Sequence, residues 1–337
     1  MKVLVTGGAG FIGSCLIKLW LERDPKVSIV NLDKLTYSGD LSRLREVKKN
    51  PQYHFFRGDV CRIEDVEKAI EGCTHVVHLA AETHVDRSLL DGKDFFDTNT
   101  YGSYVLLEAA RKKGIRRFLY VSTDEVYGSR PRGFFKENDS LNPSSPYSVS
   151  KTAADLLALS YVHTYNMDVI VTRGSNTFGP YQYPEKVIPL FVSNALADEP
   201  LPLYGDGKQI RNWVYVDDHC LGILCAFQKG QRGQVYNISS ETYLTNIELT
   251  RRILKILNKP LSLIQKVKDR AGHDRRYAID SGKLRRLGWK ESVSFDDAFR
   301  RTVLWYGENT DWWSVIKEKS LAFKSYYQKA YGNRLRK

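Results

Sequence analysis

Short apolar runs alternate with longer stretches of mixed polarity through the first half of the chain. The runs are KVLVT, KVSIVNLD, YHFFRGDV, THVVHLAA, RFLYVST and DVIVTRG. Apolar residues at helical spacing predict helices at about 11–23, 64–71, 100–113 and 147–165. Because nearly continuous apolar strands are buried on both faces, their alternation with helices indicates a parallel sheet covered by helices on each side.

The pattern changes after Gly179. PYQYPEKVIPL and LPLYGDGKQIRNWVYV read as irregular structure, and GQVYNIS predicts one more strand. From about Glu241 the chain reads as mostly helical, around a basic loop, VKDRAGHDRRYAI. We therefore predict an α/β fold with a doubly wound parallel sheet and a smaller, discontinuous C-terminal domain. The larger domain is expected at 1–175 plus about 213–240, the smaller at about 176–212 plus 241–330, and a basic tail at 331–337.

Composition narrows the classes of function. The chain has 337 residues, 42% of them hydrophobic and 27% charged, which is ordinary for a packed globular protein. The net charge of +12 is spread over scattered pairs, which favours anionic small ligands over nucleic acid. Five cysteines without CxxC spacing predict reduced thiols and no metal site or disulfide. We expect no membrane span and a cytoplasmic protein, since no signal peptide or long apolar run is present.

A glycine-rich turn follows the first predicted strand. In VLVTGGAGFIG, Gly7, Gly10 and Gly13 are spaced three residues apart and open a helix. Glycine permits a tight turn, close approach of backbone to a pyrophosphate, and close packing of helix on strand. Asp33 ends the second strand, where a carboxylate would accept hydrogen bonds from ribose hydroxyls and repel a 2′-phosphate. The motif predicts a Rossmann-type site for NAD in the larger domain and leaves substrate binding to the smaller one.

Two other strand ends border the same predicted site. Ligands of open α/β sheets bind outside the carboxyl ends of strands, which places Ala80, Ala81 and Thr83 beside the cofactor. Asp59 ends the third strand. Its role stays open between hydrogen bonding to the adenine edge and capping of the next helix.

A tyrosine and a lysine carry the first candidate chemistry. Tyr147 and Lys151 in PYSVSK are four residues apart at a predicted helix start, hence on one face, and Pro146 suits the first helical position. A tyrosine of ordinary pKa is a poor base, but a nearby lysine and a nicotinium charge would favour the phenolate. Thr123 is placed to hydrogen-bond the same hydroxyl. The set predicts removal of an alcohol proton coupled to hydride transfer to NAD.

Two adjacent acids, Asp124 and Glu125, follow Thr123 in YVSTDEVYGS. Together with the glycine motif and YxxxK, this segment resembles the extended short-chain dehydrogenase/reductase family, and within it the nucleotide-sugar 4,6-dehydratases. The likeness runs nearly end to end and includes HLAAETHVDRS, SSPYSVSK, FGPYQYPEKVIPL and DRAGHDRRYAID. It implies that Glu125 removes the C5 proton of a 4-keto sugar while Asp124 protonates the departing C6 hydroxyl.

The resemblance also implies the residues of each site. The catalytic set is Thr123, Asp124, Glu125, Tyr147 and Lys151. The NAD set is Gly7, Gly10, Phe11, Ile12, Gly13, Asp33, Lys34, Leu35, Thr36, Asp59, Val60, Leu79, Ala80, Ala81, Thr83, Thr98, Tyr147, Lys151 and Thr177. The sugar-nucleotide set is Thr83, Thr123, Asp124, Glu125, Tyr147, Asn176, Lys186, Val187, Pro202, Tyr204, Arg211, Asn237, Arg270, His273 and Tyr277. Thr83, Thr177, Phe178 and Ala271 depart from the Ser, Asn, Tyr and Pro that are usual in the family.

The implied substrate is dTDP-glucose, with UDP-glucose as an open alternative, and the implied product is the 4-keto-6-deoxy sugar nucleotide. The acid pair argues against a 4-epimerase, because similar epimerases have small residues there. A non-catalytic NAD-binding or RNA-associated protein, suggested by the charge, is disfavoured by the complete catalytic set. The resemblance further implies a homodimer with a four-helix interface built from the helices at about 100–113 and 147–165.

Overall fold

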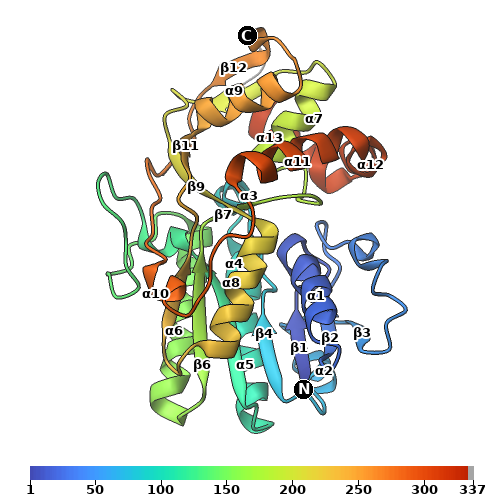
Figure 1. The fold of residues 1–337 in the computed structure, drawn as a ribbon, viewed down its shortest axis with the longest axis vertical. Coiled ribbons are helices and arrows are strands. Elements are labelled where there is room, and N and C mark those ends of the chain that lie inside the picture. The colour runs from blue at the N-terminus through green and yellow to red at the C-terminus, as the bar shows by residue number, and fades with distance from the viewer. Residues whose placement is uncertain (333–337) are drawn as a thin grey trace.

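A seven-stranded parallel sheet forms the centre of the molecule, in the order β10-β6-β5-β4-β1-β2-β3 (Figure 1). The computed structural model describes residues 1–332. The central strands β5 and β6 are buried along nearly their whole length, because helices cover both faces. This confirms the predicted doubly wound, Rossmann-type α/β sheet. The strands are β1 (Lys2–Thr6), β2 (Ser28–Asp33), β3 (Tyr53–Arg57), β4 (His75–His78), β5 (Arg117–Thr123), β6 (Val169–Gly174) and β10 (Val235–Ile238).

Five longer helices cover this sheet. They are α1 (Phe11–Arg23), α2 (Ile63–Ala69), α5 (Gly102–Lys112), α6 (Pro146–Tyr165) and α8 (Val216–Lys229). Leu16 of α1 and Ile223 of α8 share one apolar cluster, while Leu106 of α5 and Ala154 of α6 share the cluster on the other face. A π-helical turn, η2 (Phe96–Tyr101), leads into α5, and α8 was not among the predicted helices.

The expectation of irregular structure after Gly179 is wrong. That region contains α7 (Val187–Leu196) and the strands β8 (Leu201–Tyr204) and β9 (Ile210–Tyr215), and the strand β7 (Asn176–Phe178) ends directly before it. These strands are short, and α7 is apolar around nearly its whole circumference, so neither shows a clear period in the sequence. β9 pairs with β7 on one side and with β11 (Tyr243–Thr245) on the other in one small sheet, and β8 pairs with β12 (Ile264–Val267) in another.

A second apolar core lies above the main sheet in Figure 1. Phe191 of α7, Trp213 of β9 and Phe299 meet there. The C-terminal helices that build it are α9 (Asn246–Ile256), α11 (Phe295–Glu308), α12 (Thr310–Lys319) and α13 (Leu321–Tyr331). Tyr331, the first residue of the predicted basic tail, is buried at the end of α13, and 333–337 lie outside the described residues.

The remaining elements are short. They are α3 (Val85–Leu90), α4 (Lys93–Phe95), α10 (Gly282–Arg285), η1 (Leu41–Leu44), η3 (Asp124–Tyr127) and η4 (Leu261–Leu263). Of these, η3 begins directly where β5 ends, which places the two adjacent acids at the carboxyl edge of the sheet. Within residues 1–332, the helices lack the length and apolar character needed to cross a membrane.

Candidate active site

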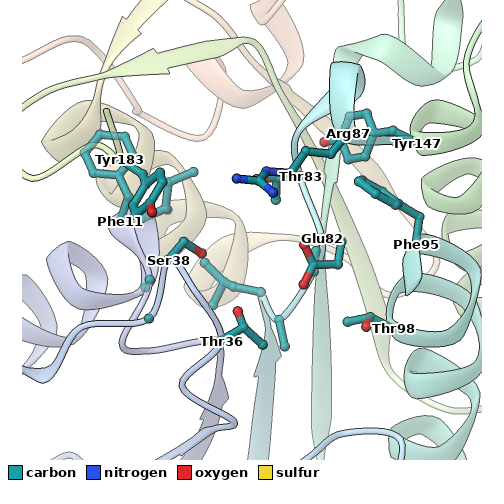
Figure 2. A pocket seen from close by; sticks show the side chains of 18 of the residues that line it. Phe11, Thr36, Ser38, Glu82, Thr83, Arg87, Phe95, Thr98, Tyr147 and Tyr183 are labelled. Carbon is teal, nitrogen blue, oxygen red and sulfur yellow. The ribbon is translucent and has the colours of Figure 1, made fainter. Parts of the chain in front are cut away.

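A cavity of about 780 Å³ lies at the carboxyl ends of the parallel strands (Figure 2). The whole predicted NAD set lines it except Leu35, whose backbone N–H instead donates to the Asp33 carboxylate at 2.8 Å. All five predicted catalytic residues line it as well. One continuous space therefore joins the two sites that the sequence motifs predict.

The three motif glycines have different structural duties. Gly7 has a positive φ of 71°, and a Cβ there would lie 2.7 Å from the Ala80 backbone nitrogen. A Cβ on Gly13 would lie 2.3 Å from the Gly7 carbonyl oxygen, so this glycine lets α1 pack on the turn. A Cβ on Gly10 would meet only that same carbonyl, at 3.1 Å, so its remaining surroundings are open toward the cavity.

This corner of the cavity fits a dinucleotide. The first turn of α1 contains no acidic residue and has no side-chain cap, so its amides and the positive end of the helix dipole are available to phosphates. Asp33 accepts hydrogen bonds from the Ala9 and Leu35 amides, which leaves lone pairs on the same carboxylate for ribose hydroxyls. Burial raises the pKa of Asp33.

Asp59, whose role the sequence left open, lines the cavity and does not cap α2, whose N-cap is Arg62. Its carboxylate accepts a hydrogen bond from the Cys61 amide at 2.9 Å, just before α2, and the residue also lines the cavity. Lys34 pairs with it at 2.7 Å, so this lysine is directed away from Asp33. Although burial opposes the effect, the Lys34 ammonium lowers the pKa of Asp59.

Local sequence fixes the position of Tyr147 and Lys151. Ser145 and Ser148 form a reciprocal capping box, and Pro146 occupies the first turn, so α6 begins with Tyr147 facing the cavity. The Lys151 ammonium donates to the Val121 carbonyl at 2.8 Å. Burial lowers the pKa of Lys151 to about 7, whereas burial and the charge of Glu125 raise the pKa of Tyr147.

In the structure, burial outweighs the stabilisation of the Tyr147 phenolate that we expect from Lys151. Both groups are withdrawn from water, and desolvation disfavours the charged form of each. The Thr123 hydroxyl donates to Asp124 Oδ1 at 3.3 Å, and it also opposes the rise of the Tyr147 pKa. Ionisation of the phenol thus depends on charge brought by a ligand more than on the lysine alone.

The adjacent acids occupy different environments. Asp124 is buried, and its Oδ2 has no hydrogen-bond partner among residues 1–332. Burial, followed by the charge of Glu125, raises the pKa of Asp124 to about 8. Burial also raises the pKa of Glu125, but the charges of Arg270, Arg211 and Lys186 oppose that rise. At neutral pH the first carboxyl keeps its proton, while the second has cations that favour its ionised form.

Several predicted substrate residues gather around Glu125. The Tyr277 hydroxyl lies 3.4 Å from Glu125 Oε2, and the Arg211 guanidinium lies over the Tyr277 ring at 4.2 Å. Lys186 lines the cavity and donates to the Thr83 carbonyl at 2.8 Å. Arg270 pairs with Asp86 at 3.2 Å and also acts electrostatically on Glu125. This side of the site is strongly cationic, as a diphosphate requires.

Other predicted substrate residues do not reach the cavity. Asn237 is 0% exposed, and its amide is held by Tyr127, the Phe135 carbonyl and the Asp280 carbonyl, so its role is structural. Pro202 lies within β8, paired with Gln265. The other predicted positions outside the lining are Arg211, Arg270 and Tyr277, described above, together with Val187 in the first turn of α7, Tyr204 bonded to Asp86, and His273 bonded to Asp269.

Thr177 and Phe178, which depart from the family pattern, make specific contacts in the structure. The Thr177 hydroxyl lies 2.6 Å from His219 Nδ1, and both residues line the cavity. Burial lowers the pKa of His219 to about 4, so the ring is neutral. Phe178 packs edge to face with Trp213 in the second core, away from the cavity.

The sequence analysis missed one wall of the cavity. Arg87 of α3 pairs with Glu185 at 2.8 Å and lies over the Tyr326 ring of α13 at 4.7 Å. Figure 2 shows Arg87 and Glu82 projecting into the cavity. HVDRS and YPEK carry Arg87 and Glu185, but no sequence signal pairs residues this far apart.

The chain is similar to proteins of known activity. The family model described as GDP-mannose 4,6 dehydratase matches residues 4–302. A dTDP-glucose 4,6-dehydratase from Actinoplanes sp. is 47% identical, over 93% of this chain and 100% of the relative.

The chain is also similar to solved structures of nucleotide-sugar enzymes. The crystal structure of the dTDP-glucose 4,6-dehydratase DesIV from Streptomyces venezuelae, which contains NAD, is 46% identical with a TM-score of 0.92, over 94% of this chain and 100% of that one. A UDP-glucose 4-epimerase from Thermus thermophilus, also with NAD, is 31% identical with a TM-score of 0.85, over 92% and 100% of the two chains. The chain therefore belongs to the GDP-mannose 4,6 dehydratase family, within the extended short-chain dehydrogenases/reductases that its motifs resemble.

Proposed function

We propose that this protein is an NAD-dependent nucleotide-sugar 4,6-dehydratase that converts dTDP-glucose into dTDP-4-keto-6-deoxyglucose and water. The observation that carries the proposal is the pair Asp124 and Glu125, two adjacent carboxyls that line the cavity at the end of β5. Burial raises the pKa of both, that of Asp124 to about 8, and the charges of three basic residues oppose the rise at Glu125. Elimination of water needs one acid and one base on neighbouring carbons, and adjacent residues at a strand end supply both. The dehydratases among the relatives support the same choice.

The residues around the glycine turn would hold NAD. The first turn of α1 and Gly10 would receive its pyrophosphate, and Asp33 its adenosine ribose. When bound, NAD accepts hydride from C4 of the sugar and returns it to C6. Because the cofactor is regenerated in each turnover, we expect it to stay bound.

Tyr147 would accept the proton of the C4 hydroxyl. Its phenol lines the cavity together with Thr123, whose hydroxyl opposes the rise of the Tyr147 pKa. The raised pKa of Tyr147 means that deprotonation needs a nearby positive charge. Lys151, fixed on the Val121 carbonyl, is one such charge when protonated, and the cationic nicotinamide ring is the other.

Glu125 and Asp124 would carry out the elimination. The new ketone acidifies the C5 proton, and Glu125, held among cations, removes it. Asp124 still carries its proton at neutral pH and gives it to the C6 hydroxyl as this leaves as water. Glu125 then returns a proton to C5 when hydride reaches C6.

The cationic side of the site would bind the nucleoside diphosphate. Arg211, Arg270 and Lys186 lie near Glu125, and we assign the diphosphate to them.

We also propose the two-domain division at 1–175 plus 213–240 and 176–212 plus 241–330. Leu284 and Trp289 are an exception, because they pack in the cluster of α1 and α8.

We also propose that the protein forms a homodimer and that it is located in the cytoplasm. Large apolar side chains are exposed on η2, α5 and α6, among them Tyr101, Tyr104, Leu156 and Tyr165, which supports a homodimer through a four-helix interface. A monomer mass by light scattering at micromolar concentration would contradict this. The five cysteines are free thiols, which suits the reducing cytoplasm.

Proton NMR in deuterated water tests the proposed function, with dTDP-glucose and UDP-glucose in parallel. A new C6 methyl signal with deuterium at C5, formed without added reductant, is the expected result. The nucleotide that turns over faster identifies the substrate. Unchanged sugars in the presence of bound NAD would reject the dehydratase, and inversion at C4 without a methyl signal would favour a 4-epimerase.

A further inference from the structure

A row of oxygen atoms leads from Glu125 to the protein surface. The Tyr277 hydroxyl lies 3.4 Å from Glu125 Oε2 and 2.7 Å from Asp274 Oδ2. Tyr277 is only 3% exposed, whereas Asp274 is partly exposed. The hydroxyl of Ser144, an exposed residue, donates to the same Asp274 oxygen. A buried phenol thus stands between a carboxylate of the cavity and a carboxylate that water reaches.

The surrounding charges hold this arrangement. The Arg211 guanidinium covers the Tyr277 ring at 4.2 Å and donates to the Asp274 carbonyl at 3.0 Å. Tyr277 and Asp274 belong to the same loop, so one arginine fixes both members of the pair. Arg270 also acts on Glu125 and on Tyr277. Arg211 and Arg270 therefore help to hold Glu125, Tyr277 and Asp274 in place, in addition to the two contacts of the Tyr277 hydroxyl.

The proposed elimination gives this row a use. Glu125 takes the C5 proton and later returns a proton to C5, while bound substrate separates its carboxylate from bulk water in the cavity. The proton either waits on Glu125 or leaves through the protein. The one neighbour of the Glu125 carboxylate with a hydroxyl that also contacts a partly exposed carboxylate, within residues 1–332, is Tyr277.

We propose that Tyr277 and Asp274 form a proton relay that exchanges the proton of Glu125 with solvent during the catalytic cycle. The inference rests on the proposed dehydratase function. In the outward direction, the Glu125 carboxyl O–H gives its proton to the Tyr277 oxygen, and the Tyr277 O–H gives its own to Asp274. Asp274 then releases that proton to water. Glu125 and Asp274 end as carboxylates and Tyr277 ends unchanged, so only a proton moves, and the reverse path brings in a solvent proton.

Isotope content at C5 tests the relay directly. Protium-labelled dTDP-glucose is converted in deuterated water by the wild type and by Tyr277→Phe, Asp274→Asn and Ser144→Ala. The wild type is expected to place deuterium at C5. Both relay variants are expected to return the original proton, so that protium becomes the major isotope at C5. Ser144→Ala is the matched control, because it removes a hydroxyl from Asp274 on the solvent side of the relay, and its product is expected to match that of the wild type.

The outcomes separate the relay from other roles. A Tyr277→Phe enzyme with a raised KM or a lowered kcat, but with full deuterium at C5, would show that Tyr277 only positions substrate or Glu125. Wild-type product that retains protium would equally reject the relay. For a variant too slow to turn over, exchange of the C5 proton of added dTDP-4-keto-6-deoxyglucose with solvent is measured instead. If the variant exchanges this proton as fast as the wild type does, the relay is rejected. Absence of any C6 methyl signal from the wild type rejects the proposed function itself.

Discussion

The two sides of the cavity are built in different ways. The cofactor side consists of one turn and one strand end, with Gly7, Gly13 and Asp33 close in sequence. The opposite side joins Arg87 of α3 to Glu185 and to the Ala322 carbonyl of α13, which lie 98 and 235 residues away. Backbone geometry makes the first side and charge pairing makes the second. A motif describes the first kind of wall, and no motif describes the second.

Loss of the proposed C5 base should have the largest effect, because Glu125 lines the cavity between these two sides of the site and would take part in the elimination itself. Removing a general base lowers a rate by about 100- to 10,000-fold, so we expect Glu125→Gln to lose dehydration by that factor. Oxidation at C4 should persist, since Tyr147 and Lys151 remain. The C6 methyl signal and the absorbance of reduced NAD measure the two steps separately, with Glu71→Gln, an exposed site, as control. Normal product from Glu125→Gln would contradict its assignment as base.

On the side of the cavity built by charge pairing, loss of one partner of the Arg87–Glu185 pair should lower the stability of the protein. Glu185 is 2% exposed at its side chain, so Arg87→Ala leaves a buried carboxylate without its partner. Breaking a buried pair costs about 3–5 kcal/mol, and the lower end applies because Arg87 is partly exposed. Denaturant unfolding of Arg87→Ala and Arg275→Ala makes the comparison. Arg275 pairs with Asp206 at the surface, and its loss should leave stability nearly unchanged. Equal losses would show that the buried wall is not held by charge.

On the cofactor side, a larger residue in the glycine turn should lower both stability and NAD affinity, because there is no room for a Cβ at Gly13. A Cβ on Gly13 would lie 2.8 Å from Gly8 Cα as well as close to the Gly7 carbonyl, so Gly13→Ala must displace α1 from the turn. Overpacking of this kind costs about 1–3 kcal/mol, and we expect NAD affinity to fall with it. Gly307→Ala is the matched control, because nothing lies within 4 Å of a Cβ there. Isothermal titration with NAD and thermal unfolding measure both effects. Unchanged NAD affinity in Gly13→Ala would contradict the tight-turn argument.

The acid pair should give the smallest effect, a pH dependence that needs no mutation. The proposed elimination uses protonated Asp124, whose pKa is raised to about 8, so the fraction that can act as an acid falls as pH rises through that value. Dehydration should therefore fall about tenfold per pH unit well above pH 8. Ionisation of Glu125 gives the rising limb at lower pH, and the two limbs describe the coupled pair. Single-turnover formation of the methyl signal across pH tests this. A rate that stays flat to pH 10 would contradict Asp124 as the acid.

Chain segments with local constraints were predicted well. The turn that needs Gly7 at positive φ, the proline that starts α6, and the strand end that presents Asp124 each depend on neighbours within a few residues. The apolar runs likewise gave the parallel sheet. For such features the sequence contains the whole physical cause, because backbone conformation and hydrogen bonding are settled over a short stretch of chain.

Features that depend on burial and on distant partners required the tertiary structure. The direction in which the pKa of Lys151 moves, the structural use of Asn237, and the pairing of Arg87 with Glu185 all follow from what folding brings near and removes from water. Desolvation and charge pairing depend on distance in space, which residue spacing does not record. The sequence by itself determined the sheet, the glycine turn and the helix start that presents Tyr147. Tertiary packing decided the protonation of that site and the wall that closes it.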